Sequence, residues 1–337
     1  MRMRVGIAGY GLAGRSFHGA LLKSCGFEVS AILTTNATRA RQAKEDFPTV
    51  KIVESMDALL ACELDLVVIA TTNDVHAPLA IASIKAGVPV VVDKPFARNI
   101  RETLEVLQAS NESSVPVTVF FNRLWDSDTL TIKKVLSQGL IGKPFRFDSR
   151  YERFRPTISP TSWRESTSPE DGGGLLLDLQ THLLSIALHL FGDSELTYSS
   201  IRDIRGNSED DVALALRHSS GVDSYLAASA ISGAPGPRIR LLGSEGALVI
   251  HDLDPQEPLL RSGQLPENGI WNLPTSSRAF LHRGDSIEEI AGVPGNYGNF
   301  YLQVKGALAG ENDWPVSHEE VIAVAEMIDR AREINVR

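Results

Sequence analysis

Residues 4–14 read RVGIAGYGLAG, and this stretch determines the fold that we predict for the chain. A short apolar run leads into Gly9, Gly11 and Gly14, which have the spacing G-x-G-x-x-G, and a helical pattern follows them. In a dinucleotide loop the first glycine permits a tight turn and the second lets the backbone approach a pyrophosphate. The third lets the helix and strand pack closely. The spacing is a weak signal by itself, so the surrounding sequence has to support it.

Apolar runs and amphipathic stretches alternate through the first third of the chain. Strands that are apolar on both faces, with helices between them, are typical of a doubly wound parallel sheet. We therefore predict an α/β Rossmann domain over residues 1–121. Its expected strands are 4–9, 28–33, 50–53, 66–70, 88–92 and 115–121, and its expected helices are 16–24, 38–47, 76–86 and 100–110.

The pattern changes after residue 121, where strand-like runs broken by turn residues extend to residue 250. This indicates an α+β domain over residues 122–337 with a large, mostly antiparallel open sheet. A capping box at Ser317 and Glu320 predicts the start of a last helix, which could pack back on the first domain. The other expected elements are helices at 127–138 and 175–191, a strand at 143–151, and loops at 156–170 and 252–296.

The composition is ordinary for a soluble globular protein, with 43% hydrophobic and 22% charged residues in a chain of 337. A formal net charge of −9 argues against nucleic acid or an anionic membrane as a partner. Cys25 and Cys62 lie far apart and indicate free thiols in a reducing compartment. The apolar N-terminal run is too short to span a bilayer, and no cluster has metal-ligand spacing. We expect a cytoplasmic protein without a metal.

The end of the second expected strand indicates which nicotinamide cofactor binds. A carboxylate there would hold the ribose 2′-hydroxyl of NAD, but the chain has Thr34, Thr35 and Asn36, with Arg39 and Arg41 close behind. Hydroxyls and cations suit a 2′-phosphate, so we predict NADP over NAD. Alternatively, the arginines are the solvated face of a helix, which fits Arg41 better than Arg39.

Residues 89–96 read PVVVDKPF, so an apolar strand ends in a carboxylate and an ammonium, Asp93 and Lys94. Buried charges are costly unless they are paired or used for chemistry. On these residues alone, a surface strand end with a solvated ion pair is the favoured interpretation. A ligand-binding position is the other, because ligands of doubly wound sheets bind at the carboxyl ends of the strands.

Four segments together resemble one protein family: GYGLAG at 9–14, ATTNDVHAPLA at 70–80, DKPF at 93–96 and GGGLLLDLQTH at 172–182. They are similar to the glucose-fructose oxidoreductase, inositol dehydrogenase and rhizopine catabolism (Gfo/Idh/MocA) family over essentially the whole chain. Within that family, residues 120–134, 152–165 and 293–301 look closest to bacterial NADP-linked scyllo-inositol dehydrogenase-type members.

The resemblance implies a catalytic set of Lys94, Asp178 and His182. Asp178 and His182 are four residues apart and share one face of an expected helix, although each alone could be a satisfied core residue. His182 would be the general base, Lys94 would stabilise the developing alkoxide, and Asp178 would orient the substrate or the His182–Lys94 pair. Three positions depart from the family pattern: Asp93 replaces glutamate, Gln180 replaces glycine, and Ser185 replaces aspartate.

Further site residues follow from the family match. Thr71, Thr72, Asn73 and His76 match a cofactor-lining loop, although Asn73 or Asp74 could instead cap a helix. The complete expected cofactor set is Gly9, Gly11, Leu12, Ala13, Gly14, Thr34, Thr35, Arg39, Thr71, Thr72, Asn73, His76, Asp93, Lys94, Trp163 and Arg164. The expected substrate residues are Asn122, Arg123, Trp125, Arg153 and Tyr297, of which the tryptophan and the tyrosine could equally be packing residues.

These features predict an NADP-dependent oxidoreductase, with NAD possible, that transfers hydride to or from a secondary alcohol or ketone of a cyclitol, polyol or sugar. A keto-sugar or trans-dihydrodiol oxidoreductase, or a non-catalytic nucleotide-binding sensor, are the alternatives. The resemblance also implies a homodimer or homotetramer that associates through the C-terminal sheet.

Overall fold

The computed structural model describes residues 2–158, 163–271 and 278–335, and the chain divides into two compact units. Unit 1 consists of Met1–Asn122, Gln256–Asn272 and Asn296–Val321. Unit 2 consists of Arg123–Pro255, Leu273–Gly295 and Ile322–Arg337. Two late segments of the chain therefore belong to the same unit as the N-terminal residues.

Unit 1 is built on a six-stranded sheet with the order β3-β2-β1-β4-β5-β6, and every neighbouring pair is parallel. The predicted doubly wound sheet is confirmed. The order reverses between β1 and β4, and ligands of such sheets bind beyond the strand ends at that point. All residues of β4, β5 and β6 are buried, as their apolar sequences predict. The strands are β1 Arg4–Ala8, β2 Glu28–Leu33, β3 Lys51–Val53, β4 Leu66–Ile69, β5 Val90–Asp93 and β6 Val117–Phe120.

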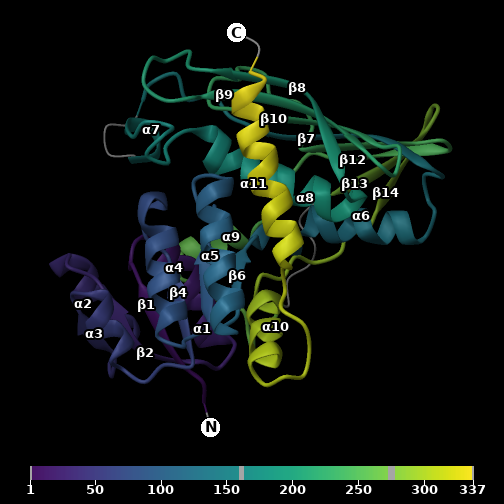
Figure 1. Ribbon diagram of the computed structural model, residues 1–337. Helices are drawn as coiled ribbons and strands as arrows, with labels where there is room; N and C mark the ends of the chain where they lie inside the picture. Colours follow the sequence, from purple (N-terminus) through teal and green to yellow (C-terminus); the bar gives the residue numbers. More distant parts are fainter. Residues whose placement is uncertain (1, 159–162, 272–277, 336–337) are drawn as a thin grey trace. The chain divides into compact units, whose positions relative to one another are not determined.

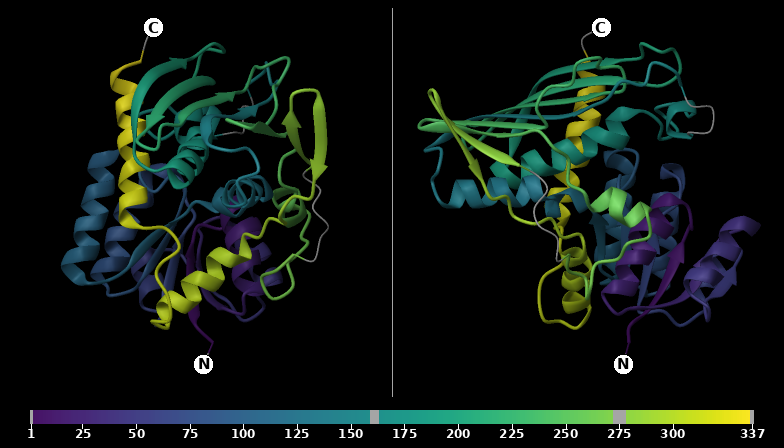
Figure 2. Two further views of the ribbon diagram at one scale, coloured as in Figure 1. Left: turned by 90° about the vertical axis from the view of Figure 1, so that its right-hand side faces the viewer. Right: turned by 180° about the vertical axis from the view of Figure 1, so that it is seen from behind.

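Helices cover both faces of this sheet. Figures 1 and 2 show α4 and α5 side by side on one face and the continuous η1–α1 helix on the other. Asn36 caps α2 and Asn99 caps α5 through their side chains. The helices are η1 Ala13–Gly19, α1 Ala20–Ser24, α2 Ala37–Asp46, α3 Met56–Leu60, η2 Asn73–Val75, α4 His76–Lys85, α5 Ile100–Ser113, α9 Gln256–Arg261 and α10 Gly298–Leu308.

Unit 2 contains an eight-stranded sheet with the order β14-β13-β12-β11-β7-β10-β9-β8. Its neighbouring strands are antiparallel except for β7 and β10, which are parallel. The predicted mostly antiparallel sheet is confirmed. Its strands are β7 Pro144–Glu152, β8 Ser194–Arg202, β9 Asp211–His218, β10 Asp223–Ser229, β11 Ile239–Gly243, β12 Gly246–Ile250, β13 Ala279–Arg283 and β14 Ser286–Ile290.

Helices α6 and α8 lie on the same face of the unit 2 sheet (Figure 1). The predicted helix at 175–191 begins with a π-helical turn, η4, and continues as α8. The predicted capping box is confirmed, because Glu320 N donates to Ser317 Oγ and Ser317 N donates to Glu320 Oε2. The remaining helices are η3 Asn122–Trp125, α6 Ser127–Ser137, α7 Trp163–Ser166, η4 Leu176–Gln180, α8 Thr181–Phe191 and α11 His318–Glu333.

The predicted loop at 252–296 is wrong, because it contains α9, β13 and β14. Figure 2 shows the β13–β14 hairpin at one edge of the sheet. Four of the five β14 residues are exposed, so this edge strand lacks the apolar alternation that identifies a strand in a sequence. The short helix α3 and the helix α10 were not predicted either. Part of the predicted loop at 156–170 lies outside the described residues, and the rest includes α7.

Candidate active site

Two glycines of the loop after β1 are required by the packing of the chain itself. Gly9 has a φ of +91°, and a Cβ atom there would lie 2.5 Å from the carbonyl oxygen of Ala70. A Cβ atom on Gly14 would collide with the carbonyl oxygen of Gly9. These contacts hold the start of η1 tightly against the ends of β1 and β4.

Gly11 differs from the other two, because no close protein contact requires a glycine there. The nearest atoms to a Cβ on Gly11 belong to the guanidinium of Arg39, at 3.8–3.9 Å, which is an ordinary contact distance. Because glycine has no side chain, a ligand has room to reach the backbone at this position. Leu12 precedes the helix without a side-chain cap, so the first N–H groups of η1, beginning at Ala13, suit a phosphate. The loop thus fits a dinucleotide.

The end of β2 supplies the side chains that face the ribose in folds of this kind. Thr34 is buried and its hydroxyl accepts from Asn36 N at 3.3 Å, while Thr35 is exposed. The two nearby arginines differ. The guanidinium of Arg39 lies beside Gly11, whereas Arg41 donates to Thr38 Oγ1 of its own helix at 3.3 Å. Only Arg39 therefore lies beside the dinucleotide loop.

The loop after β4 is attached to the DKPF segment by His76, a fully buried side chain whose Nδ1 donates to the carbonyl of Pro95 at 2.8 Å. Burial lowers the pKa of His76, and the charge of Asp93 only partly offsets this. A neutral imidazole thus joins the two segments. The helix-cap alternative for Asn73 and Asp74 is not supported. Thr72 and Val75 occupy the cap positions of η2 and α4, and neither helix has a side-chain cap.

Asp93 is the last residue of β5, and Lys94 follows it half-buried. Asp93 is only 7% exposed, so the interpretation as a fully solvated ion pair does not hold for its carboxylate. His18 Nε2 lies 3.4 Å from Asp93 Oδ1. Burial alone would raise the pKa of Asp93, but His18 and Lys94 hold it below its usual value. The carboxylate is therefore ionised at neutral pH.

In unit 2, Asp178 lies in the π-helical turn η4 and His182 lies in α8, four positions later. Asp178 is half-buried and His182 is 5% exposed. The His182 ring meets the Tyr151 ring at a centroid distance of 6.1 Å in an edge-on arrangement. Tyr151 therefore limits the orientations open to this imidazole.

The two departures from the family pattern in this helix have structural partners. Gln180 Nε2 donates to the carbonyls of Val212 and Leu226 at 3.2 and 3.1 Å, which fastens η4 to the neighbouring strands β9 and β10. Ser185 Oγ donates to the backbone carbonyl of His182 at 3.0 Å. Both side chains thus stabilise the backbone around His182.

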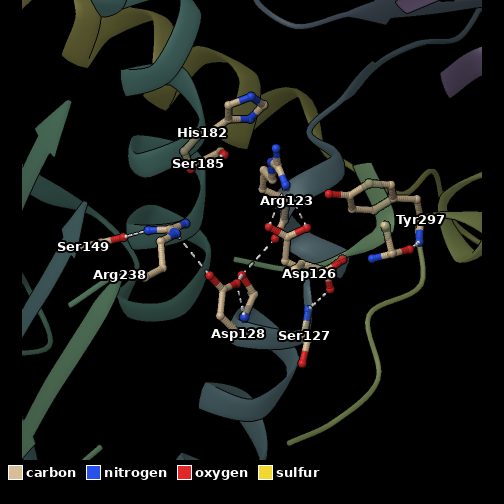
Figure 3. A network of polar contacts seen from close by, with 12 residues as sticks. Arg123, Asp126, Ser127, Asp128, Ser149, His182, Ser185, Arg238 and Tyr297 are labelled. Atoms are coloured by element: carbon tan, nitrogen blue, oxygen red, sulfur yellow. Dashed lines mark hydrogen bonds and ion pairs between the residues drawn. The ribbon is translucent and has the colours of Figure 1, made fainter. Parts of the chain in front are cut away.

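A buried network of charged residues lies next to His182 in unit 2 (Figure 3). Arg238 is 3% exposed, lies 3.3 Å from Asp128 and donates to Ser149 Oγ at 2.6 Å. Its guanidinium stacks 3.9 Å from the centre of the Tyr151 ring. Burial raises the pKa of Tyr151 to about 12, although two arginines oppose the shift. The sequence alone does not indicate Tyr151, Asp128 and Arg238, because no local pattern joins residues so far apart in the chain.

The expected substrate residues divide between the units. Asn122 and Tyr297 belong to unit 1, where Tyr297 N donates to Gln256 Oε1 at 2.6 Å. Arg123, Trp125 and Arg153 belong to unit 2, where Arg123 pairs with Asp126 at 3.3 Å and lies 5.7 Å from the Tyr151 ring centre. Trp163 and Arg164 lie in α7, and their side chains are outside the described part.

Residues 3–121 match the oxidoreductase family with an NAD-binding Rossmann fold, and residues 129–249 match the Gfo/Idh/MocA C-terminal domain. The chain belongs to the Gfo/Idh/MocA oxidoreductase family. The resemblance that the four sequence segments indicate is confirmed. As a member of this family, the protein is an NAD(P)-dependent oxidoreductase with a small-molecule substrate.

Two curated proteins and one solved structure are similar to this chain over almost their full length. The uncharacterised oxidoreductase YdgJ of Escherichia coli is 35% identical, over 97% of this chain and 94% of YdgJ. The scyllo-inositol 2-dehydrogenase (NADP(+)) IolW of Bacillus subtilis is 32% identical, over 98% of this chain and 93% of IolW. The solved structure of the oxidoreductase yvaA from Bacillus subtilis has 31% identity and a TM-score of 0.89, covering 99% and 96% of the two chains.

Residues 2–158, 163–271 and 278–335 contain no group of three or more His, Cys, Asp or Glu side chains that could hold a metal ion. Within the same ranges, none of the helices combines the length and the apolar character that a membrane span needs.

Proposed function

We propose that this protein transfers hydride reversibly between NADP and a secondary alcohol of a cyclitol, polyol or sugar. The observation that supports it most is the buried, ionised Asp93 beside Lys94 at the carboxyl end of β5. Parallel strands of this fold present their ligand-binding residues at that end. The name of the relative IolW supports scyllo-inositol as the first substrate to test and NADP as the cofactor.

In this proposal Lys94, Asp178 and His182 act on one substrate hydroxyl. His182 removes the hydroxyl proton as general base, since an imidazole titrates near neutral pH. Lys94 stabilises the developing alkoxide by its charge. Asp178 orients the substrate hydroxyls or the His182–Lys94 pair. The nicotinamide supplies the hydride acceptor when it is bound. The proposed domains are residues 1–121 for the cofactor and residues 122–337 for the substrate, although Gln256–Asn272 and Asn296–Val321 of the second range pack in unit 1.

A panel of cyclitols, polyols and sugars, assayed by nicotinamide absorbance with NADP and with NAD, tests the function directly. We expect turnover of scyllo-inositol or a related cyclitol with NADP. Turnover confined to keto-sugars or trans-dihydrodiols would move the proposal to those alternatives. Tight cofactor binding without turnover of any compound would contradict a dehydrogenase role and favour a sensor.

Arg39 is expected to select NADP. The guanidinium beside Gly11 is placed to pair with a 2′-phosphate, and a charge-assisted contact of this kind contributes about 1.5–3 kcal/mol. Arg39→Ala should therefore weaken NADP binding by about tenfold or more and change NAD binding little. Binding titrations with both nucleotides measure this, and Thr35→Asp should shift preference in the same direction.

Arg41→Ala is the matched control for Arg39, because Arg41 lies on the same helix and donates to Thr38. It should leave both affinities unchanged. The 2′-phosphate would bind elsewhere if Arg39→Ala lost affinity equally for NADP and NAD. The same conclusion would follow if Arg41→Ala had the same effect as Arg39→Ala.

We propose that the protein assembles as a homodimer or homotetramer through the unit 2 sheet. Tyr198 and Tyr225 lie opposite Ala215 on neighbouring strands and are 46% and 40% exposed. Ile287 of β14 is 62% exposed. Large exposed apolar side chains on one sheet favour burial against another copy. Light scattering after size exclusion should give two or four chains for the wild type and one for Tyr225→Glu; a monomeric wild type would exclude the assembly.

A further inference from the structure

His18 is a completely buried histidine of unit 1 that belongs to neither the predicted cofactor set nor the predicted catalytic set. It lies in η1, a few residues after the glycine loop. Its Nδ1 lies 2.6 Å from the hydroxyl of Tyr301 in α10, and its Nε2 lies 3.4 Å from Asp93 Oδ1 at the end of β5. A hydrogen bond joins Tyr301 to His18 and a charge contact of 3.4 Å joins His18 to Asp93, so the three side chains form a polar chain that ends at the carboxylate preceding Lys94.

The protonation state of Tyr301 determines which group donates in the hydrogen bond between Tyr301 and His18. Burial raises the pKa of Tyr301 well above its usual value, and the charges of Asp93 and Cys25 add to the shift. The phenol therefore keeps its proton and can donate it to His18 Nδ1. A neutral imidazole that accepts at Nδ1 carries its hydrogen on Nε2, which faces Asp93.

Aromatic rings hold the chain in place. Phe120 lies 4.6 Å from His18 and 5.9 Å from Tyr301, measured between ring centroids, and Phe27 meets Tyr301 edge-on at 6.0 Å. Phe120 is also the strand partner of Asp93, because β5 and β6 pair these two residues. The imidazole is thus enclosed by apolar groups, where a misdirected N–H would be costly.

Asp93 is surrounded by ionisable groups from each element around it. His18 approaches from η1, His76 from α4, Tyr301 from α10, and Lys94 is the next residue. Burial alone favours the neutral acid, and His18 and Lys94 are the main groups that hold the pKa of Asp93 below its usual value. Removing His18 would remove a group that stabilises the ionised carboxylate of Asp93. That carboxylate precedes Lys94, whose ammonium the proposed reaction uses.

We propose that His18 and Tyr301 are positioning residues that hold the Asp93 carboxylate ionised and fixed, and through it orient the Lys94 ammonium for catalysis. This rests on the proposed function of Lys94. Tyr301, His18 and Asp93 interact in the free protein, so the direction of the hydrogen bond between Tyr301 and His18 is measurable without a substrate. That measurement separates a failure of this inference from a failure of the proposed function.

The first test is the tautomer of His18, read from long-range ¹H–¹⁵N correlation spectra of the free protein near pH 7.5. His18→Gln identifies the signal by its loss. We expect the wild type to show a neutral imidazole protonated at Nε2, and Tyr301→Phe to show a mixture of tautomers. A wild-type His18 that is protonated at Nδ1, or at both nitrogens, would overturn the inference.

The second test is kinetic, on whichever substrate the panel yields. His18→Leu should lower kcat by about a hundredfold with little change in KM for the nucleotide, because the reacting groups are misplaced rather than lost. His18→Gln keeps an N–H that can reach Asp93 and should recover most of that loss. The pH profile of kcat should shift in His18→Leu and return toward the wild-type profile in His18→Gln.

Phe27→Leu is the control for simple packing, since Phe27 contacts Tyr301 but lies outside the polar chain. It should reduce stability without moving the pH profile. The inference is wrong if Phe27→Leu and His18→Leu alter kcat and the pH profile alike, or if His18→Gln recovers none of the lost kcat. His18 and Tyr301 would then contribute only to packing. If the wild type turns over no substrate, the proposed function fails. The tautomer measurement alone then tests whether His18 donates to Asp93.

Discussion

Replacing Lys94 or His182 by alanine is expected to lower kcat by about a hundredfold to ten thousandfold, the range typical of lost charge stabilisation or general-base catalysis. Lys94 would no longer stabilise the alkoxide, and His182 would no longer accept the hydroxyl proton. The affinity for the nucleotide should stay within about tenfold of the wild type, because the glycine loop and Arg39 remain. Steady-state kinetics on the identified substrate, with nucleotide titrations alongside, measure both quantities.

Lys85→Ala is a suitable control for Lys94, because Lys85 is exposed in the last turn of α4. It removes one lysine of unit 1 without touching the ends of the strands, and it should retain the wild-type kcat. Wild-type rates in Lys94→Ala or in His182→Ala would remove that residue from the mechanism.

The second large effect concerns stability. Asp128→Ala should lower the free energy of unfolding by about 3–5 kcal/mol, as expected when one partner of a buried ion pair is removed. Arg238 would lose its counter-charge 3.3 Å away while its side chain stays 2% exposed. Urea unfolding followed by circular dichroism measures the change.

The exposed pair of Arg217 and Asp223 provides the comparison. Their side chains are 69% and 32% exposed, and they lie 2.9 Å apart. Solvent screens such a pair, so Asp223→Ala should cost less than about 1 kcal/mol. Equal small losses in both variants would mean that other groups compensate the charge of Arg238.

The sequence predicts the sheet of unit 1 well because its strands β4, β5 and β6 are buried on both faces. Val90–Asp93 and Val117–Phe120 are fully buried and consist mostly of apolar residues, and such runs between helices have few alternative structures. The glycine loop is also predictable from the sequence, because backbone contacts require glycine at two of its positions. Local sequence is sufficient where local packing decides the structure.

Prediction fails where the deciding contacts are distant or exposed. The edge strand Ser286–Ile290 is held by its neighbour in the sheet and buries little, so it has no apolar pattern of its own. Arg238 and Asp128 are 110 positions apart, and nothing near either residue indicates the other. His18 resembles any lone histidine in an apolar stretch until Tyr301, 283 residues later, is placed against it.

A crystal structure of the protein with bound NADP and an identified polyol is the most direct test of the proposed reaction site. The proposal predicts that Lys94 Nζ and a ring nitrogen of His182 both lie within about 3 Å of the same substrate hydroxyl, at hydrogen-bond distance. That hydroxyl carbon should face the nicotinamide ring. A substrate bound with either side chain turned away from its reacting carbon would contradict the mechanism.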